Sequence, residues 1–194
     1  LVRMINAMAE ASYIGENTDL ILGQDFLTWL WYKSETSNGL FRMSKGTAKA
    51  GEPFSLNMEQ RVVVRGGEGD NRETASVSGS LSPLREARLG LLTGKLVVRA
   101  LARLEKDGMN WQVTLRADDF SIGSLRTPQV AKSEEGDDPD ALFLEKIYLI
   151  ESCLDMLDDV YRQFLTVRLT PSAWGHEVRE VAEWMRRDIS QGAM

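Results

Sequence analysis

The 194-residue chain contains one histidine, His176, and one cysteine, Cys153, which leaves little material for metal or nucleophile chemistry. A zinc site needs several His or Cys ligands, and two residues cannot supply them. Cys153 lies in an apolar helical stripe with Ile150, Leu154 and Leu157, a pattern that predicts a buried structural thiol. His176 is predicted to lie on the surface at a helix start. We therefore expect no metal site and no cofactor.

Glycine-rich and acidic segments do not supply a catalytic site either. The glycine cluster at 66–69 lacks the Gly-Lys-Ser/Thr ending of a phosphate loop and predicts a turn between strands. The adjacent pairs Asp118-Asp119 and Asp158-Asp159 diverge on a strand or on a helix, so neither pair can converge on a substrate. The sequence therefore predicts no catalytic residue and a protein that is not an enzyme.

The remaining candidate function is anion binding by the basic residues. Their uneven distribution along the chain does not show in the net charge. The net charge is −6, which at face value argues against a polyanion binder. Residues 80–132, however, carry nine basic and five acidic residues, whereas residues 133–160 carry one basic and ten acidic residues. A basic middle segment is thus followed by an acidic block. One cysteine excludes an internal disulfide framework, and no apolar run approaches the roughly 20 residues of a membrane span.

Two alternating segments position these basic residues on predicted strands. Residues 54–65 alternate between apolar and polar side chains, as in a half-buried strand. Residues 95–119 contain two alternating runs around Asp107-Gly108, which is a strong hairpin signal. A turn centred there places Leu104 opposite Trp111 on an apolar face and Arg99 opposite Arg116 on a polar face.

The polar faces of these strands form the predicted binding surface. Like charges opposed across strands are destabilising, so the Arg99–Arg116 pair requires water, a carboxylate or a bound anion. A basic sheet face can follow a phosphate backbone without reading base sequence. The alternative is that these are ordinary solvated arginines, partly neutralised by the acidic block. The candidate DNA-binding residues are Lys95, Arg99, Arg103 and Arg116 on the hairpin, and Arg61 and Arg65 on the strand at 54–65.

The rest of the chain predicts an α+β fold with an antiparallel sheet, packed helices and a long C-terminal helix followed by a shorter helix. We expect an α+β sheet domain at 1–132, then an acidic linker (133–140) and a C-terminal helical hairpin packed on the sheet, which together make up 133–194. The further predicted elements are helices at 24–35, 82–93, 139–168 and 173–189, a strand at 73–79 and a loop at 37–52.

The long helix carries an apolar heptad seam, whose residues follow intervals of four and three. Such a seam packs either on the last helix and the sheet or against a second copy of the chain. Its members are Phe143, Ile147, Ile150, Leu154, Leu157, Tyr161 and Phe164.

Three segments resemble the recombination-associated protein RdgC family. They are FLTWLWYKSE at 26–35, EARLGLLTGKLVVRALARLEKDGMNWQVTL at 86–115 and DDPDALFLEKIYLIESCLDMLDDVYRQFL at 137–165. Their order and spacing match the C-terminal part of family members, which are about half as long again. The chain, which begins at Leu1, is accordingly interpreted as either a fragment or a reduced relative.

The resemblance implies a cytoplasmic, nucleoid-associated protein that binds double-stranded DNA without sequence preference and forms a ring-shaped homodimer. It also implies modulation of RecA-dependent recombination by limiting the access of RecA to DNA. Lys95, Arg99 and Arg103 lie on the strand that matches the family's basic strand. The alternative to DNA binding is a protein–protein assembly or dimerisation module that binds no nucleic acid.

Overall fold

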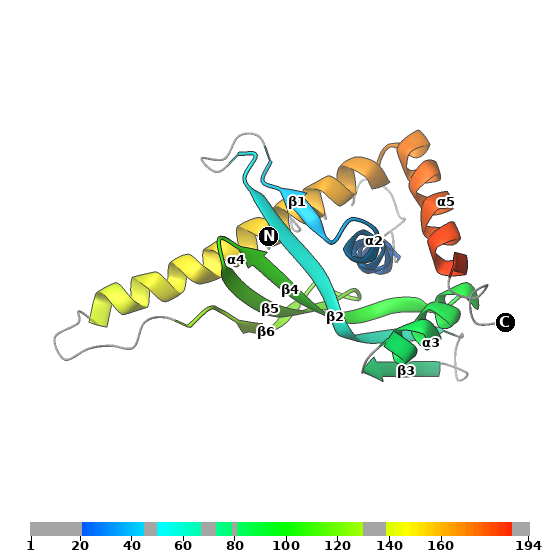
Figure 1. Ribbon diagram of the computed structural model, residues 1–194, viewed down its shortest axis with the longest axis horizontal. Coiled ribbons are helices and arrows are strands. Elements are labelled where there is room, and N and C mark those ends of the chain that lie inside the picture. Colours follow the sequence, from blue (N-terminus) through cyan, green and yellow to red (C-terminus); the bar gives the residue numbers. More distant parts are fainter. Residues whose placement is uncertain (1–20, 45–49, 67–72, 79–80, 130–138, 188–194) are drawn as a thin grey trace.

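The computed structural model describes residues 21–44, 50–66, 73–78, 81–129 and 139–187, and it has the predicted α+β architecture (Figure 1). Its strands are β1 (Leu40–Arg42), β2 (Pro53–Gly66), β3 (Glu73–Ser78), β4 (Leu96–Lys106), β5 (Met109–Arg116) and β6 (Ile122–Arg126). Its helices are α2 (Leu22–Thr36), α3 (Leu81–Leu92), α4 (Pro139–Arg168) and α5 (Pro171–Arg187). None of these helices is both long enough and apolar enough to cross a membrane.

The long strand β2 organises the antiparallel sheet. Its first residues pair with β1 and its last residues pair with β3, whereas β4 occupies its other edge. Strands β5 and β6 follow β4, so the order is β1-β2-β4-β5-β6 with β3 beside the far end of β2. The prediction of a loop at 37–52 is wrong for β1, because a strand of three residues is too short to show an alternating pattern.

The β4–β5 hairpin has the predicted register. Leu104 lies opposite Trp111, and Arg99 lies opposite Arg116. Asp107 and Gly108 form the turn with positive φ angles of 51° and 77°, which are the angles that a two-residue hairpin turn requires. The turn residues therefore set the register, and the alternation of the two strands sets which side chains share a face.

One face of the sheet packs against the helices and forms the core. The side chains of Leu56, Ala102, Leu104, Trp111 and Val113 on this face are at most 1% exposed. Aromatic residues of α2 and α4 fill the space above them, through ring contacts that include Phe26–Tyr161, Phe26–Phe164 and Trp29–Phe164. The aromatic segment that the sequence predicted as a helix is thus the centre of the helical layer.

A carboxylate joins α2 to the helices beside it. The Nε1 atoms of Trp31 and Trp184 both donate hydrogen bonds to Glu35, at 2.7 and 3.1 Å. Arg88 of α3 forms an ion pair with the same carboxylate at 2.6 Å and stacks over Trp184. Glu35 therefore connects three helices through two tryptophans and one arginine.

Helices α4 and α5 have nearly the predicted bounds, but they pack differently from the prediction. Helix α5 turns steeply away from the end of α4, so it does not run back along α4 as a hairpin, and it contacts α3 and α2 as well as α4 (Figure 1). The heptad seam of α4 is buried at Leu157, Tyr161 and Phe164 but exposed at Phe143 and Ile150. The seam therefore packs on the body of the protein only in its C-terminal half. The predicted acidic linker lies mostly outside the described residues.

Candidate nucleic-acid interface

The face of the sheet opposite the helices, here called the open face, carries most of the predicted binding residues. Along β4 and β5 the positions that alternate with the core are exposed or half-buried. Arg99, Arg103 and Arg116 belong to this set and are all exposed. Val63 lies opposite Arg99 in the sheet, which places Arg61 and Arg65, two residues to either side of Val63 on β2, on the same face.

A β-bulge moves Lys95 to the other face, and this corrects the sequence prediction. Between Val63 and Val64 the register of β2 with β4 shifts by one residue, so that Arg65 pairs with Leu96. Leu96 then takes the position on the open face, and Lys95 packs on the side of α3. A methyl group added at Gly66 would lie 2.6 Å from Cγ of Lys95, and one added at Gly90 would lie 3.3 Å from its Cδ. The two glycines therefore make room for the lysine stem.

One end of the open face, here called the arginine end, consists of Arg61, Arg65, Arg99 and Arg116. Among the described residues no carboxylate forms an ion pair with Arg61, Arg99 or Arg116. Arg65 forms an ion pair with Asp118 at 3.2 Å, and both side chains are well exposed. Three guanidinium groups on this end are therefore available to an external anion.

Two aspartates border the arginine end. Asp118 is the partner of Arg65, and Asp119 accepts a hydrogen bond from the backbone N–H of Ser121 at 3.0 Å. Hydrogen bonds from the side chain and the backbone of Ser121 lower the pKa of Asp119, and the nearby charge of Arg116 lowers it further. Both aspartates are exposed acidic neighbours of the arginines.

The other end of the open face contains a polar hollow with a different charge. Its volume is about 560 Å³, and it is lined by Ser55, Asn57, Met58, Glu59, Arg103 and Glu105. Arg103 donates two hydrogen bonds to Oδ1 of Asn110, at 3.0 and 2.7 Å. Glu59 accepts a hydrogen bond from Gln112 at 2.6 Å. Two carboxylates flank Arg103, so this end is less favourable for an anion than the arginine end.

Strand β6 adds a basic residue that the sequence reasoning missed. Arg126 pairs with Gln112 of the open face and is exposed. Directly paired residues share a face of an antiparallel sheet, so Arg126 extends the basic surface across β6. The five-residue strand contains glycine and serine, and its two apolar residues, Ile122 and Leu125, are three positions apart and so give no alternating pattern.

The open face of the described sheet carries no aromatic ring. The aromatic residues of β1, β2 and β5, namely Phe41, Phe54 and Trp111, are all in the core. Base stacking on aromatic side chains is the usual means of holding single-stranded nucleic acid. The face as described therefore offers charge and hydrogen-bond donors, but no stacking platform.

The residues with catalytic potential lie elsewhere and are inert or isolated. Burial raises the pKa of Cys153 to about 12, so its thiol is protonated at neutral pH, and His176 is exposed on α5. The predictions of a buried structural thiol and a surface histidine are confirmed. Within the described part of the chain, no group of three or more His, Cys, Asp or Glu residues could hold a metal ion.

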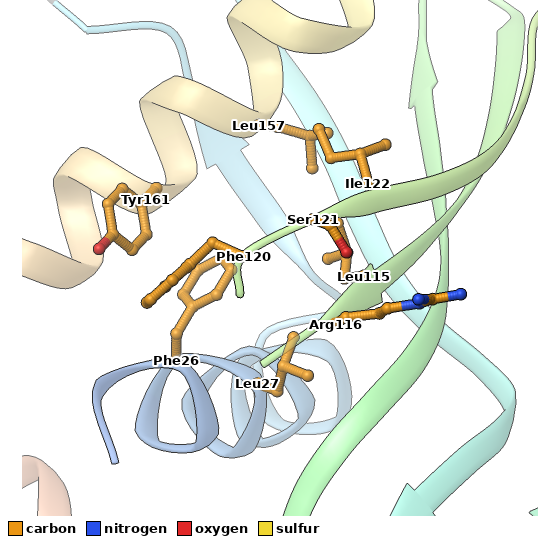
Figure 2. Close-up of a pocket in the computed structure, with 9 residues that line it drawn as sticks. All are labelled: Phe26, Leu27, Leu115, Arg116, Phe120, Ser121, Ile122, Leu157 and Tyr161. Atoms are coloured by element: carbon orange, nitrogen blue, oxygen red, sulfur yellow. The ribbon is translucent and has the colours of Figure 1, made fainter. Parts of the chain in front are cut away.

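A small apolar pocket lies between α2, α4 and the segment that joins β5 to β6 (Figure 2). Phe26, Phe120 and Tyr161 form its aromatic side, and the guanidinium of Arg116 points away from it. The space inside amounts to about 30 Å³, which is the volume of roughly one water molecule. This pocket is too small for a substrate.

Comparisons of the chain with protein-family models, with curated proteins and with solved structures find no match. The resemblance to the RdgC family therefore rests on the three sequence segments alone.

Proposed function

We propose that the protein binds double-stranded DNA without sequence preference, through phosphate contacts made by the open face. The observation that carries this proposal is the cluster of Arg61, Arg99 and Arg116, which lies on an exposed face with no carboxylate paired to it within the described residues. Arg99 and Arg116 are directly opposed in the hairpin, and their mutual repulsion is relieved when an anion lies between them. A phosphate group is such an anion.

The lack of aromatic rings on the face, as far as the structure describes it, favours duplex over single-stranded DNA. Arginines that project from a sheet can contact a phosphate backbone wherever it passes, so they carry no sequence information. A single strand, in contrast, is held mainly by base stacking. We therefore expect a preference for duplex and similar affinity for different base sequences.

The test is a charge reversal at the arginine end. The double substitution Arg99→Glu/Arg116→Glu is expected to weaken duplex binding on the order of tenfold, measured by fluorescence anisotropy at two salt concentrations. The slope of log affinity against log salt should become shallower by roughly 0.9 for each phosphate that the variant no longer neutralises. Arg179→Glu/Arg186→Glu is the matched control, because both arginines are exposed on α5 and the change in net charge is identical. Equal weakening by the two double variants, or none by the first, would refute the assignment of this face.

The family resemblance extends the proposal to recombination. A protein that occupies duplex DNA through the open face would limit the access of RecA to that DNA. We expect the wild-type protein to slow RecA-promoted strand exchange, and the Arg99→Glu/Arg116→Glu variant to leave the reaction rate unchanged. If both proteins slowed strand exchange, the effect on RecA would not depend on the arginines of the open face.

A further inference from the structure

The N-terminal half of α4 carries an exposed stripe that is apolar at one end and acidic at the other. Leu144 is 63% exposed and Tyr148 is 51% exposed. Glu151 and Asp155, which follow at intervals of three and four residues, are exposed as well. Residues at these intervals share one side of a helix. These four residues are called the outer stripe.

The outer stripe faces away from the sheet. Helix α4 packs on the body of the protein through Leu149 and Cys153, which are 4% and 0% exposed, and the carbonyl oxygen of Leu149 accepts a hydrogen bond from Trp111 on the covered face. Leu144 and Tyr148 each precede one of these two residues by five positions, which corresponds to about 140° around the helix axis. The outer stripe and the open face therefore lie on different sides of the molecule, so a partner on one does not block the other.

The apolar end of the outer stripe is wide enough to pack against another helix. Phe143, which is 63% exposed, and Ile147, which is half-buried, lie beside Leu144 and Tyr148. Four neighbouring apolar side chains form one contiguous surface, and contiguous exposed apolar surface marks interaction sites. From Phe143 to Asp155 the helix rises by about 18 Å, which is about three turns. A partner helix of about that length can cover the stripe.

The charges next to the apolar end specify a basic partner. Residues 139–160 contain six acidic residues and one basic residue, Lys146. Within the described residues, neither Glu151 nor Asp155 forms an ion pair. Nucleic acid or an anionic membrane would be repelled by these carboxylates, whereas lysine or arginine side chains would pair with them.

The same charges disfavour a second copy of this chain as the occupant. In a parallel pair of outer stripes, Glu151 and Asp155 would lie against the same two carboxylates of the other copy. In an antiparallel pair they would lie against Leu144 and Tyr148, which offer no positive charge. Neither arrangement neutralises the acidic end, so the occupant must be a different chain.

We propose that the outer stripe docks a basic amphipathic helix of another protein. Apolar side chains of that helix cover Phe143, Leu144 and Tyr148, and lysines or arginines further along it pair with Glu151 and Asp155. Because the open face lies elsewhere, a DNA-bound molecule of this protein could hold the partner at the same time. The docking itself does not rest on the proposed DNA binding.

The test is the binding of a synthetic helix to the full chain without DNA, measured by fluorescence anisotropy. The probe is a peptide of about 18 residues, with leucines at helical intervals of three and four and lysines on the other positions. A matched peptide carries glutamates in place of the lysines. We expect the lysine peptide to bind at least about tenfold more tightly than the glutamate peptide, and its affinity to fall as salt rises.

Substitutions in the outer stripe locate the binding. Glu151→Lys/Asp155→Lys should weaken binding of the lysine peptide on the order of tenfold, because two attractions become two repulsions, and should strengthen binding of the glutamate peptide. Phe143→Ser/Leu144→Ser should weaken binding of the lysine peptide to a similar extent by removing apolar contact. Glu180→Lys/Glu183→Lys on α5 makes the same change in net charge and is the control, which should leave the affinity within about twofold of wild type.

Several results would overturn the proposal. They are failure of the lysine peptide to bind, equal affinity for the two peptides, and equal weakening by the outer-stripe and control charge variants. A second copy as occupant would appear in sedimentation equilibrium as a dimer that Phe143→Ser/Leu144→Ser dissociates. A membrane as occupant would appear as binding to phosphatidylcholine vesicles that the same variant abolishes. Since DNA is absent from every measurement, failure of this docking is distinguishable from failure of the open face to bind DNA.

Discussion

The two faces of the β4–β5 hairpin share one backbone but differ in the polarity, the exposure and the packing of their side chains. On the covered face Leu104 and Trp111 are opposed and at most 1% exposed. On the open face their neighbours Arg103 and Gln112 are opposed and accessible to solvent. The covered face holds the sheet to the helices, whereas the open face contributes little to that packing. Substitutions on the two faces should therefore change different quantities: stability on one face, and DNA affinity on the other.

The largest effect is expected for Trp111→Ala on the covered face. The substitution leaves a large cavity and removes the hydrogen bond from the indole N–H to the carbonyl oxygen of Leu149, which is 2.8 Å long. We expect the free energy of unfolding to fall by about 3–5 kcal/mol, measured by urea denaturation. A decrease below about 1 kcal/mol would mean that α4 does not depend on this contact with the sheet.

A smaller decrease is expected for Glu35→Ala in the helical layer above the covered face. This change removes the acceptor for Trp31 and Trp184 and the charge partner of Arg88. Hydrogen bonds to a charged group are worth about 1.5–3 kcal/mol, so the free energy of unfolding should fall by about 2–3 kcal/mol. Glu183→Ala, at an exposed site on α5, is a control that should cost far less. Similar decreases in the two variants would show that the helices are not held together by Glu35.

Substitutions of Lys95 and Arg99 are expected to differ in their effect on DNA affinity. Both are basic residues near the same end of β4, but the bulge places them on opposite faces. Arg99→Glu should weaken duplex binding several-fold, whereas Lys95→Glu should weaken it by less than about twofold. Anisotropy titrations at one salt concentration suffice for this comparison. Equal weakening by the two variants would mean that DNA contacts more than the open face.

The smallest effect is expected for Asp118→Asn, which removes the charge partner of Arg65 without reversing any sign. The pair is exposed, so the free energy of unfolding should change by no more than about 0.5 kcal/mol. Duplex affinity should rise about twofold, because Arg65 gains freedom to contact phosphate. Lower affinity would indicate that Asp118 orients Arg65 for binding.

The hairpin and the long helix could be predicted because local residues determine them. Asp107-Gly108 sets the turn, the strict alternation sets the register, and Pro139 marks the start of α4, whereas α5 begins at Pro171, two residues before its predicted start. The β-bulge opposite Val63 and Val64, in which Val98 is the extra residue of β4, could not be predicted, because no local residue type indicates it. It depends on how β2 bends against β4, and it decides which face Lys95 occupies.

Periodicity also could not tell how far the seam of α4 is covered. The repeat continues unchanged from Phe143 to Phe164, whereas the burial of its members depends on distant partners such as Phe26 and Phe120. Arg126 was missed for a related reason, because β6 is defined by its pairing with β5 and hardly by its own sequence. In each case pairing or packing between distant segments determines the position of the residue, and the local sequence pattern does not show it.

The pairing of β2 also has a consequence for the order of folding. The β4–β5 hairpin closes through a two-residue turn, whereas nearly fifty residues separate Leu56 from its partner Leu104. Closing the loop between Leu56 and Leu104 costs more chain entropy than closing the hairpin, and this cost arises before the contacts between β2 and β4 can offset it. We therefore expect the hairpin to form first and to serve as the template on which β2 docks, so that the arginines of β4 and β5 share a surface before those of β2 join them.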